Sequence, residues 1–334
     1  MYLSFVVKIY INKYIRYRKI FNKVKQDGIM DEKVKTPPIL LMAFKRPETT
    51  KKVFEKIREV RPKKFFFAVD GPRNEKEKRL VDQVKELAKL VDWKCDFKTN
   101  FKKENTGLKE GLIDNITWFF DHVDEGIILE DDCLVDSSFF RFCREMLDKY
   151  REDHRIMHIA GSNPHRGWRR NNYSYYFSHY TYSWGWATWK RAWKKIEADN
   201  INYNKIKEKG YLKDIYPKWY ERMYLKKGFN LVYSDKLKSW DHHWLFTSGA
   251  NSLLSIVPNK NLVKNIGIGP DASNTKGKLN NELSLSSHKM NFPLNHPAFV
   301  IRDLTSDNKY GWKLFRRGIR NNIFRILGIS KFLG

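Results

Sequence analysis

Three consecutive carboxylates, Glu130, Asp131 and Asp132, follow an apolar run at residues 126–129 in a chain whose formal net charge is +26. Adjacent carboxylates repel one another, by about 1 kcal/mol per pair at about 4 Å even in bulk water. A divalent cation would offset this repulsion, and hard oxygen ligands suit Mg²⁺ or Mn²⁺, above all a cation that already carries phosphate groups. Because side chains alternate along a strand, we expect Glu130 and Asp132 on one face and Asp131 on the other. The alternative is an acidic turn exposed to solvent.

The segments that must position these acids alternate between strand and helix patterns. Apolar runs at residues 39–44, 63–70 and 126–129 predict buried strands, and an alternating run at 93–99 predicts another. Apolar stripes with helical spacing lie between them. This β-α-β-α-β-α-β order predicts an α/β fold, with a mostly parallel central sheet and helices on both of its faces.

Polar residues follow three of these strands directly. Lys45 and Arg46 follow the first strand, Asp70 follows the second, and the three acids follow the fourth. Ligands of parallel α/β sheets bind at the carboxyl ends of the strands. The sequence therefore predicts one ligand site at which these polar ends meet.

Aromatic residues are frequent after about residue 160, and ten of them fall within residues 173–193. Aromatic faces stack on sugar rings, and the polar tips of Tyr and Trp hydrogen-bond hydroxyl groups. So many large rings cannot all face solvent, and we expect most of them in the core.

The composition is typical of a globular protein. The 334 residues are 41% hydrophobic with a mean hydropathy of -0.64, enough for one large α/β domain or two smaller ones. No apolar run approaches the roughly 18 residues of a membrane span, and residues 1–11 make a poor signal peptide. Three cysteines without metal or disulfide spacing favour a reducing compartment. We therefore expect the protein to be cytoplasmic, with peripheral contact to the inner face of the cell membrane as an extension of that expectation.

Positive charge is concentrated at both ends of the chain. Residues 1–35 hold nine Lys/Arg and three acids, a net of +6, and residues 309–334 hold seven Lys/Arg and no acid, a net of +7. Apolar residues recur at helical spacing in the second segment, at Trp312, Phe315, Ile319, Ile323 and Ile326. Basic amphipathic segments bind anionic membrane surfaces, and docking as ordinary helices is the alternative. Nucleic acid is not an expected partner, because it gives the three acids no role.

Several motifs follow one another in a recognisable order. A strand with a basic tip, Asp70-Gly71, the three acids, Trp184-Gly185-Trp186, Trp240-Asp241 and a loop at 258–275 succeed each other along the chain. With these motifs the chain resembles the GT-A-fold nucleotide-sugar glycosyltransferases, in layout the N-acetylglucosaminyltransferase I group and bacterial sugar-transferase relatives. The resemblance covers about residues 37–276.

The resemblance implies a GT-A fold with two halves, and the two basic ends outside it bring the division of the chain to four segments. The nucleotide-sugar-binding half would span residues 36–160, and the acceptor and catalytic half would span 161–300. A basic amphipathic leader at 1–35 and a basic amphipathic tail at 301–334 would flank them.

The resemblance also implies a role for each candidate residue. Asp132 would coordinate a Mn²⁺ or Mg²⁺ ion that bridges the nucleotide diphosphate. Glu130 and Asp131 would bind the ribose and the donor sugar, or support the metal. Arg46 and Asp70 would hold the uracil base through stacking and hydrogen bonds.

Two further candidates lie in the second half. Asp241 matches the position of the family's general base. An inverting transferase needs one carboxylate to remove the proton of the attacking acceptor hydroxyl, although an Asp at this place could also be a helix cap. Ser273 belongs to a loop at 261–275 whose Ser, Asn and backbone N–H donors could close over the diphosphate.

The expected activity is transfer of a sugar from a nucleotide-diphosphate donor, a UDP-sugar by expectation, to a glycan or lipid-linked acceptor. We expect the transfer to invert the configuration of the sugar and to depend on a divalent cation. We also expect it to serve bacterial surface-polysaccharide or lipopolysaccharide synthesis. A sugar-phosphate nucleotidyltransferase is one alternative, but it should carry a Gly-rich basic loop after the first strand, and residues 43–47 form no such loop. A non-enzymatic basic protein that binds membrane or RNA is the other.

Overall fold

The computed structural model describes residues 35–196, 201–267 and 285–326, with side chains described up to residue 320. The chain divides after Lys35, and the fold below is that of the unit that follows it. The predicted basic leader, except for Lys35, therefore lies outside the described residues. None of the described helices is both long enough and apolar enough to cross a membrane.

The first half of the chain forms four parallel strands in the spatial order β3-β2-β1-β4. They are β1 (Ile39–Ala43), β2 (Lys64–Val69), β3 (Asp96–Phe101) and β4 (Glu125–Glu130). The strand predicted at 93–99 begins three residues later, because Trp93 turns aside and donates its indole N–H to the Pro62 carbonyl oxygen at 3.0 Å. The predicted parallel arrangement of this half is confirmed.

The second half extends the same sheet to eight strands with mixed directions. The added strands, in spatial order after β4, are β8 (Trp186–Trp189), β6 (Ile156–Ala160), β9 (Leu254–Pro258) and β7 (Tyr175–Ser178). Strand β8 runs antiparallel to both neighbours, and β7 runs antiparallel to β9. A separate antiparallel pair consists of β5 (Cys133–Val135) and β10 (Val263–Asn265). The protein is thus α/β with a large, mostly parallel, mixed sheet.

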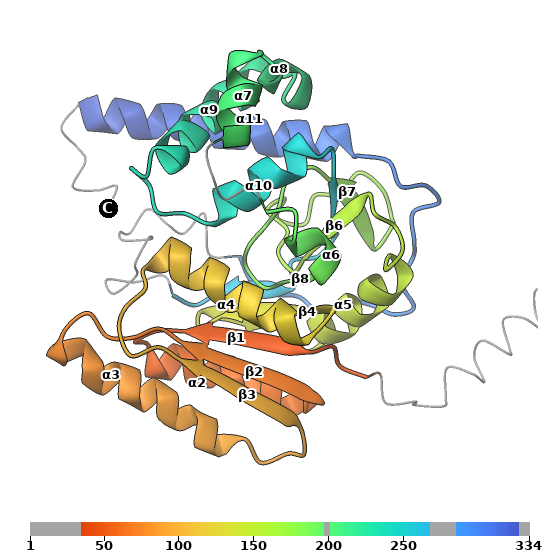
Figure 1. The fold of residues 1–334 in the computed structure, drawn as a ribbon. Coiled ribbons are helices and arrows are strands. Elements are labelled where there is room, and N and C mark those ends of the chain that lie inside the picture. Colours follow the sequence, from red (N-terminus) through yellow and green to blue (C-terminus); the bar gives the residue numbers. More distant parts are fainter. Residues whose placement is uncertain (1–34, 197–200, 268–284, 327–334) are drawn as a thin grey trace, which may run out of the picture. The chain divides into compact units, whose positions relative to one another are not determined.

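Helices cover both faces of this sheet (Figure 1). In chain order the described helices are α2 (Pro47–Val60), α3 (Glu75–Glu86), the 3-10 turn η1 (Leu87–Leu90), α4 (Leu108–His122), α5 (Ser138–Lys149), α6 (Lys190–Trp193), α7 (Ile201–Glu208), α8 (Leu212–Ile215), α9 (Trp219–Tyr233), α10 (Asp241–Ala250) and α11 (Leu304–Ile326). Helices α2, α3 and α5 pack on one face, whereas α4, α6 and α10 pack on the other.

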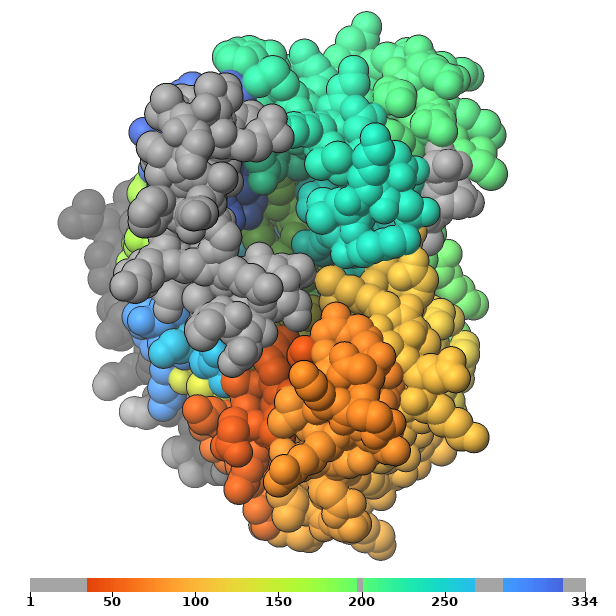
Figure 2. Space-filling model, turned by 90° about the vertical axis from the view of Figure 1, so that its left-hand side faces the viewer, coloured from red at the N-terminus to blue at the C-terminus, as the bar shows by residue number. Residues whose placement is uncertain are grey.

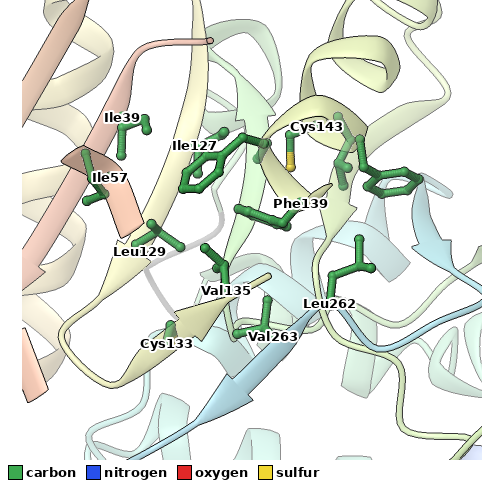
Figure 3. Packing of buried hydrophobic residues seen from close by; sticks show 14 of the residues in the cluster. Ile39, Ile57, Ile127, Leu129, Cys133, Val135, Phe139, Cys143, Leu262 and Val263 are labelled. Atoms are coloured by element: carbon green, nitrogen blue, oxygen red, sulfur yellow. The ribbon is translucent and has the colours of Figure 1, made fainter. Parts of the chain in front are cut away.

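The strands bury both of their faces. In β1, Ile39 and Leu41 join the cluster beneath α2 and α3, whereas Leu40 and Met42 join the cluster beneath α4. Figure 3 shows this first cluster continuing past the acidic turn, where the side chains of Cys133 and Val135 of β5 lie near those of α5 and β10. The acids are therefore held between two anchored strands, β4 and β5.

The aromatic segment at 173–193 is mostly core, as predicted. Eight of its ten rings are buried, and the exceptions, Tyr173 and Trp184, are half-buried. Trp186 of β8 stacks on Trp240 with ring centroids 5.4 Å apart, so this core also reaches the residue before α10.

The basic tail begins as a docked helix. In α11, Phe315 is only 6% exposed and packs on Trp219 of α9, with ring centroids 5.1 Å apart. Near the helix start, the buried Asp307 accepts hydrogen bonds from Ser178 and Arg302. The predicted apolar stripe is nevertheless divided, because Trp312 and Ile319 stay 45% and 42% exposed.

Acid is expected to destabilise the fold through His158 in β6. This side chain is fully buried, with Nε2 3.1 Å from the Tyr182 carbonyl oxygen and Nδ1 accepting the Trp244 indole N–H at 3.1 Å. Burial lowers the pKa of His158 from 6.5 to about 3. Because the unfolded chain takes up the proton first, the free energy of unfolding should fall as pH drops from about 6.5 towards 3.

Urea unfolding at a series of pH values would measure this fall. We expect the contribution of His158 to approach about 1.4 kcal/mol per pH unit below its unfolded pKa. The variant His158→Gln keeps a side chain that can donate and accept, and it should show a flatter pH dependence. An equally steep dependence in that variant would mean that the proton is taken up elsewhere.

Candidate functional site

The carboxyl ends of β1, β2 and β4 meet at one edge of the sheet. Their register sets Ala43 beside Val69 and Met42 beside Glu130, so the three strands end almost level. The Asp70 N–H donates to the Ala43 carbonyl oxygen at 3.1 Å and extends this alignment past the strand end. The predicted convergence of the three strand ends is confirmed.

Arg46 bridges two of the three acids. Its Nη2 lies 2.9 Å from Oδ1 of Asp131, and its Nη1 lies 3.0 Å from Oδ2 of Asp132. Arg46 reaches them because β1 has ended and Pro47 starts α2 directly afterwards. In this structure the guanidinium therefore faces the acids, whereas the sequence reading assigned it to a nucleotide base.

The acids remain short of positive charge despite this bridge. Glu130, Asp131 and Asp132 carry three formal charges and Arg46 offsets one, which leaves two. Burial raises the pKa of Asp131 to about 7, against the lowering effects of Arg46 and of the Phe44 N–H, which lies 3.3 Å from Oδ2. Burial, Asp132 and Asp131 also raise the pKa of Glu130.

This donor set fits a divalent cation that is held largely by a ligand. Within the described ranges, no group of three or more His, Cys, Asp or Glu side chains could hold a metal by itself. The uncompensated charge at the three acids equals that of one Mg²⁺ or Mn²⁺ ion, and Mg²⁺ is commonly bound by one or two carboxylates together with substrate phosphates. Asp132 is the more accessible of the two carboxylates that Arg46 bridges, because its side chain is 14% exposed and that of Asp131 is 4% exposed.

The segment after β10 lies against Asp132. Strand β10 pairs with β5 so that Asn265 sits opposite Cys133, and the Ile266 N–H donates to the Asp132 carbonyl oxygen at 2.8 Å. A Cβ on Gly267 would lie 2.3 Å from Oδ2 of Asp132 and 2.4 Å from Nη1 of Arg46. Only glycine fits here without displacing the ion pair. Ser273, farther along the predicted loop, lies outside the described residues.

The variant Gly267→Ala should therefore damage the site more than the fold. We expect a loss of stability of about 1–3 kcal/mol from overpacking, and a loss of about 10²-fold in any turnover that uses Asp132, since the new Cβ must move that carboxylate. Thermal unfolding and turnover of the same preparations would measure the two effects.

Gly210→Ala is the matched control for this variant. Gly210 lies in an exposed turn at φ 74° with open space around its Cα, so alanine there costs about 1–2 kcal/mol of backbone strain without touching the site. Equal losses of turnover in the two variants would contradict the role given to Gly267.

Asp70 is engaged by the loop before α4. Its Oδ1 accepts the backbone N–H of Thr106 and of Gly71, at 3.0 and 2.9 Å, and its Oδ2 accepts the Asn105 amide at 2.8 Å. These bonds attach the loop to the end of β2, and they give Asp70 a structural role. Asp70 thus borders the site, with its carboxylate already bonded to protein donors.

Two tryptophans position α10 and with it Asp241. Trp240 stacks on Trp186 of β8, and Trp244 lies 5.8 Å from the same ring, centroid to centroid. Because Trp186 pairs with Ile128 of β4, two residues before Glu130, this packing holds the start of α10 beside the acidic edge. Figure 2 shows the surface where the residues leading into α10 meet α4, a contact that includes the Lys109–Asp235 ion pair at 3.2 Å.

Asp241 is held as a carboxylate by its own neighbours. Ser239 donates its hydroxyl to Asp241, and Nδ1 of His242 lies 3.2 Å from the same oxygen, Oδ1. Burial acts to raise the pKa of Asp241, but the hydrogen bonds from His242 and Ser239 lower it overall. Asp241 is also near enough to Glu130 to raise the pKa of that residue. An ionised carboxylate at the start of α10 therefore acts electrostatically on the acidic edge.

The structure brings most of the predicted residues together. Arg46, the three acids and Asp241 surround one edge of the sheet, and Asp70 borders it. Sequence reasoning did not include Ser239, whose hydroxyl contacts both Asp241 and His242. Its position two residues before Asp241 is the signal that could have identified it.

The functional conclusion rests on these residues and their geometry. No protein-family model matches the chain, and no curated protein matches it in sequence.

Proposed function

We propose that this protein is a glycosyltransferase of the GT-A type, which moves a sugar from a nucleotide-diphosphate donor, a UDP-sugar, to a glycan or lipid-linked acceptor. One observation carries the proposal: an ionised Asp241 lies near enough to act on Glu130, in a carboxyl-end cluster of three acids whose formal charge exceeds that of Arg46 by two. A base opposite a cation-and-diphosphate site is the arrangement that displacement at a sugar carbon requires.

The residues divide this work by position. Asp132 would hold a Mn²⁺ or Mg²⁺ ion together with the donor phosphates, and the ion would neutralise charge on the departing diphosphate. Glu130 would face the donor sugar from the end of β4. Asp241 would accept the proton of the acceptor hydroxyl as that oxygen attacks the anomeric carbon, which inverts its configuration.

Arg46 has a positioning role in this proposal. Its bonds to Asp131 and Asp132 fix the direction of both carboxylates before any ligand arrives. Because Arg46 offsets only one of the three formal negative charges, the site keeps a residual negative charge. The site would therefore still attract a cation.

The same contacts disfavour a nucleotidyltransferase. That reaction needs a glycine-rich basic loop that presents backbone N–H groups to a triphosphate. Here the segment after β1 leads straight into Pro47, which has no N–H, and its Arg46 is paired with the acids.

A screen of nucleotide sugars tests the proposal without knowledge of the acceptor. The full chain is incubated with each sugar nucleotide and Mn²⁺, and slow hydrolysis is followed by release of the nucleoside diphosphate. We expect release of UDP from at least one UDP-sugar, and its loss on addition of EDTA. Release of pyrophosphate from a nucleoside triphosphate and a sugar phosphate would instead establish the nucleotidyltransferase. Absence of both, and of Mn²⁺-dependent binding, would contradict catalysis at this edge.

A further inference from the structure

A cationic cavity lies between α11 and the loop after β6. Its volume is about 540 Å³, and six cationic side chains line it: Arg166, Lys309, Lys313, Arg316, Arg317 and Arg320. None of the described residues that line it is acidic. Five of the six come from α11, and their positions along the helix place them on one face of it. The sequence predicts these charges on an amphipathic tail that either binds a membrane or docks as a helix.

The opposite wall contributes the sixth cation through a constrained backbone. Arg166 adopts φ 53°, a left-handed conformation that is unfavourable for a non-glycine residue, and Gly167 follows at φ 85°. This turn brings Arg166 to a cavity whose other cations all come from α11, a segment far away along the chain. Like charges gathered in this way repel one another, and an anion would relieve the repulsion.

A residue with a buried, unpartnered polar atom also lines this cavity. His165 lines it and is only 9% exposed, and its Nε2 has no hydrogen-bond partner among the described residues. Burial, together with Lys309 and Lys313, lowers the pKa of His165 to about 4, so its ring is neutral at neutral pH. A neutral imidazole N–H is a good donor to a phosphate oxygen, and a buried polar atom without a partner is costly.

The candidate base acts electrostatically on one residue of the cavity wall. Tyr310 forms part of its wall, and Asp241 is near enough to raise the pKa of Tyr310, after the larger effect of burial. Arg317 of the cavity acts on the same Tyr310 hydroxyl in the opposite direction. A molecule held here could therefore extend towards Asp241.

We propose that this cavity binds a phosphate or diphosphate group carried by the acceptor. Six cations and one unpartnered imidazole nitrogen suit a compact, multiply charged oxyanion better than an isolated carboxylate. The exposed ring of Trp312 at the rim gives an attached sugar or lipid an apolar surface. Binding of the phosphate follows from the cavity alone, whereas its identity as the acceptor's phosphate rests on the proposed glycosyl transfer.

Titration of the full chain with inorganic pyrophosphate tests the binding. EDTA is present throughout, so that no cation can recruit pyrophosphate to Asp132. We expect the double variant Lys309→Gln/Lys313→Gln to bind pyrophosphate about tenfold or more weakly than the natural chain. The matched control is Lys51→Gln/Lys52→Gln, which removes two exposed lysines from α2 and should change the affinity less than about twofold.

A second variant separates the effect of the cavity's own hydrogen-bonding group from the effect of net charge. His165→Phe keeps the aromatic ring and the charge at neutral pH but removes the unpartnered nitrogen, and we expect severalfold weaker binding of pyrophosphate. Thermal unfolding of each variant checks that the fold is retained. Equal weakening in both lysine pairs, or no binding by the natural chain, would overturn the proposal.

Two further measurements identify the source of the phosphate and its relation to catalysis. Vesicles of phosphatidylcholine with phosphatidic acid present the same group on a lipid. Binding to them that pyrophosphate displaces, and that Lys309→Gln/Lys313→Gln weakens, supports a lipid-borne phosphate. Binding of pyrophosphate without binding of vesicles supports a phosphate carried by a soluble acceptor. Vesicle binding that neither pyrophosphate nor Lys309→Gln/Lys313→Gln reduces would overturn the cavity as the site. Donor hydrolysis should be unchanged in the lysine variant, so failure of the proposed function would appear separately, as absent hydrolysis in the natural chain.

Discussion

Replacing Asp132 by Asn is expected to lower cation-dependent release of UDP from the donor by about 10³-fold. Asparagine preserves the shape of the side chain but removes the charge that would bind a divalent cation. A cation at the leaving group is worth several kcal/mol of transition-state stabilisation, and about 4 kcal/mol corresponds to this factor. The amide oxygen can still accept from Arg46, so the local fold should persist.

Mn²⁺ binding and donor hydrolysis should be measured together on this variant. We expect weaker Mn²⁺ binding in the presence of UDP and a thermal midpoint close to that of the natural chain. Asp121→Asn, on the exposed surface of α4, is the matched control and should behave like the natural chain. Hydrolysis by Asp132→Asn at the natural rate with Mn²⁺ present would remove this residue from the metal site.

Replacing Asp241 by Asn is expected to lower sugar transfer by about 10²–10⁴-fold, the range for loss of a general base. Donor binding should hardly change, because Asp241 lies on α10 and not among the residues that would hold the diphosphate. The amide can still accept from Ser239, so the start of the helix should stay in place. The signature is therefore a large fall in kcat with little change in the Kd of the donor.

The pH profile of transfer distinguishes a base from a positioning residue. In the natural chain, the rate should fall at acid pH as Asp241 takes up a proton, and the variant should lose that limb of the profile. Asp235→Asn removes a neighbouring carboxylate, exposed and in a left-handed conformation that asparagine tolerates, and should leave kcat unchanged. An unaltered acid limb in Asp241→Asn would assign the proton to another group.

Local pattern was sufficient to predict the first half of the fold. The apolar runs of β1, β2 and β4 are buried on both faces, and strand–helix alternation requires parallel neighbours, so these strand ends had to meet at one edge. The polar residues that follow them, from Arg46 to Asp132, were therefore predictable as one cluster. The mixed second half was not, because its short strands pair with distant partners, as β8 does with β4 and β6.

Contacts across the sequence decided what the individual residues do. The register of β1 and β4 brings the Arg46 guanidinium to Asp131 and Asp132, and its predicted contact with a base stays a prediction. Asp70 could have met a ligand, but the loop at Asn105 reaches it first. In both cases the side chain's partner lies more than thirty residues away, beyond any local pattern.

The sequence by itself determined that three acids end a buried strand in an α/β sheet, and that the tail is a basic helix. These properties depend on the periodicity and charge of neighbouring residues. Only the tertiary structure decided that Asp241 lies near enough to act on Glu130, since stacking of Trp240 on Trp186 holds the start of α10. It also decided that the cations of α11 line one cavity with Arg166, although the two segments lie far apart in the sequence. Such placements arise from packing between distant segments, which the local order of residues does not specify.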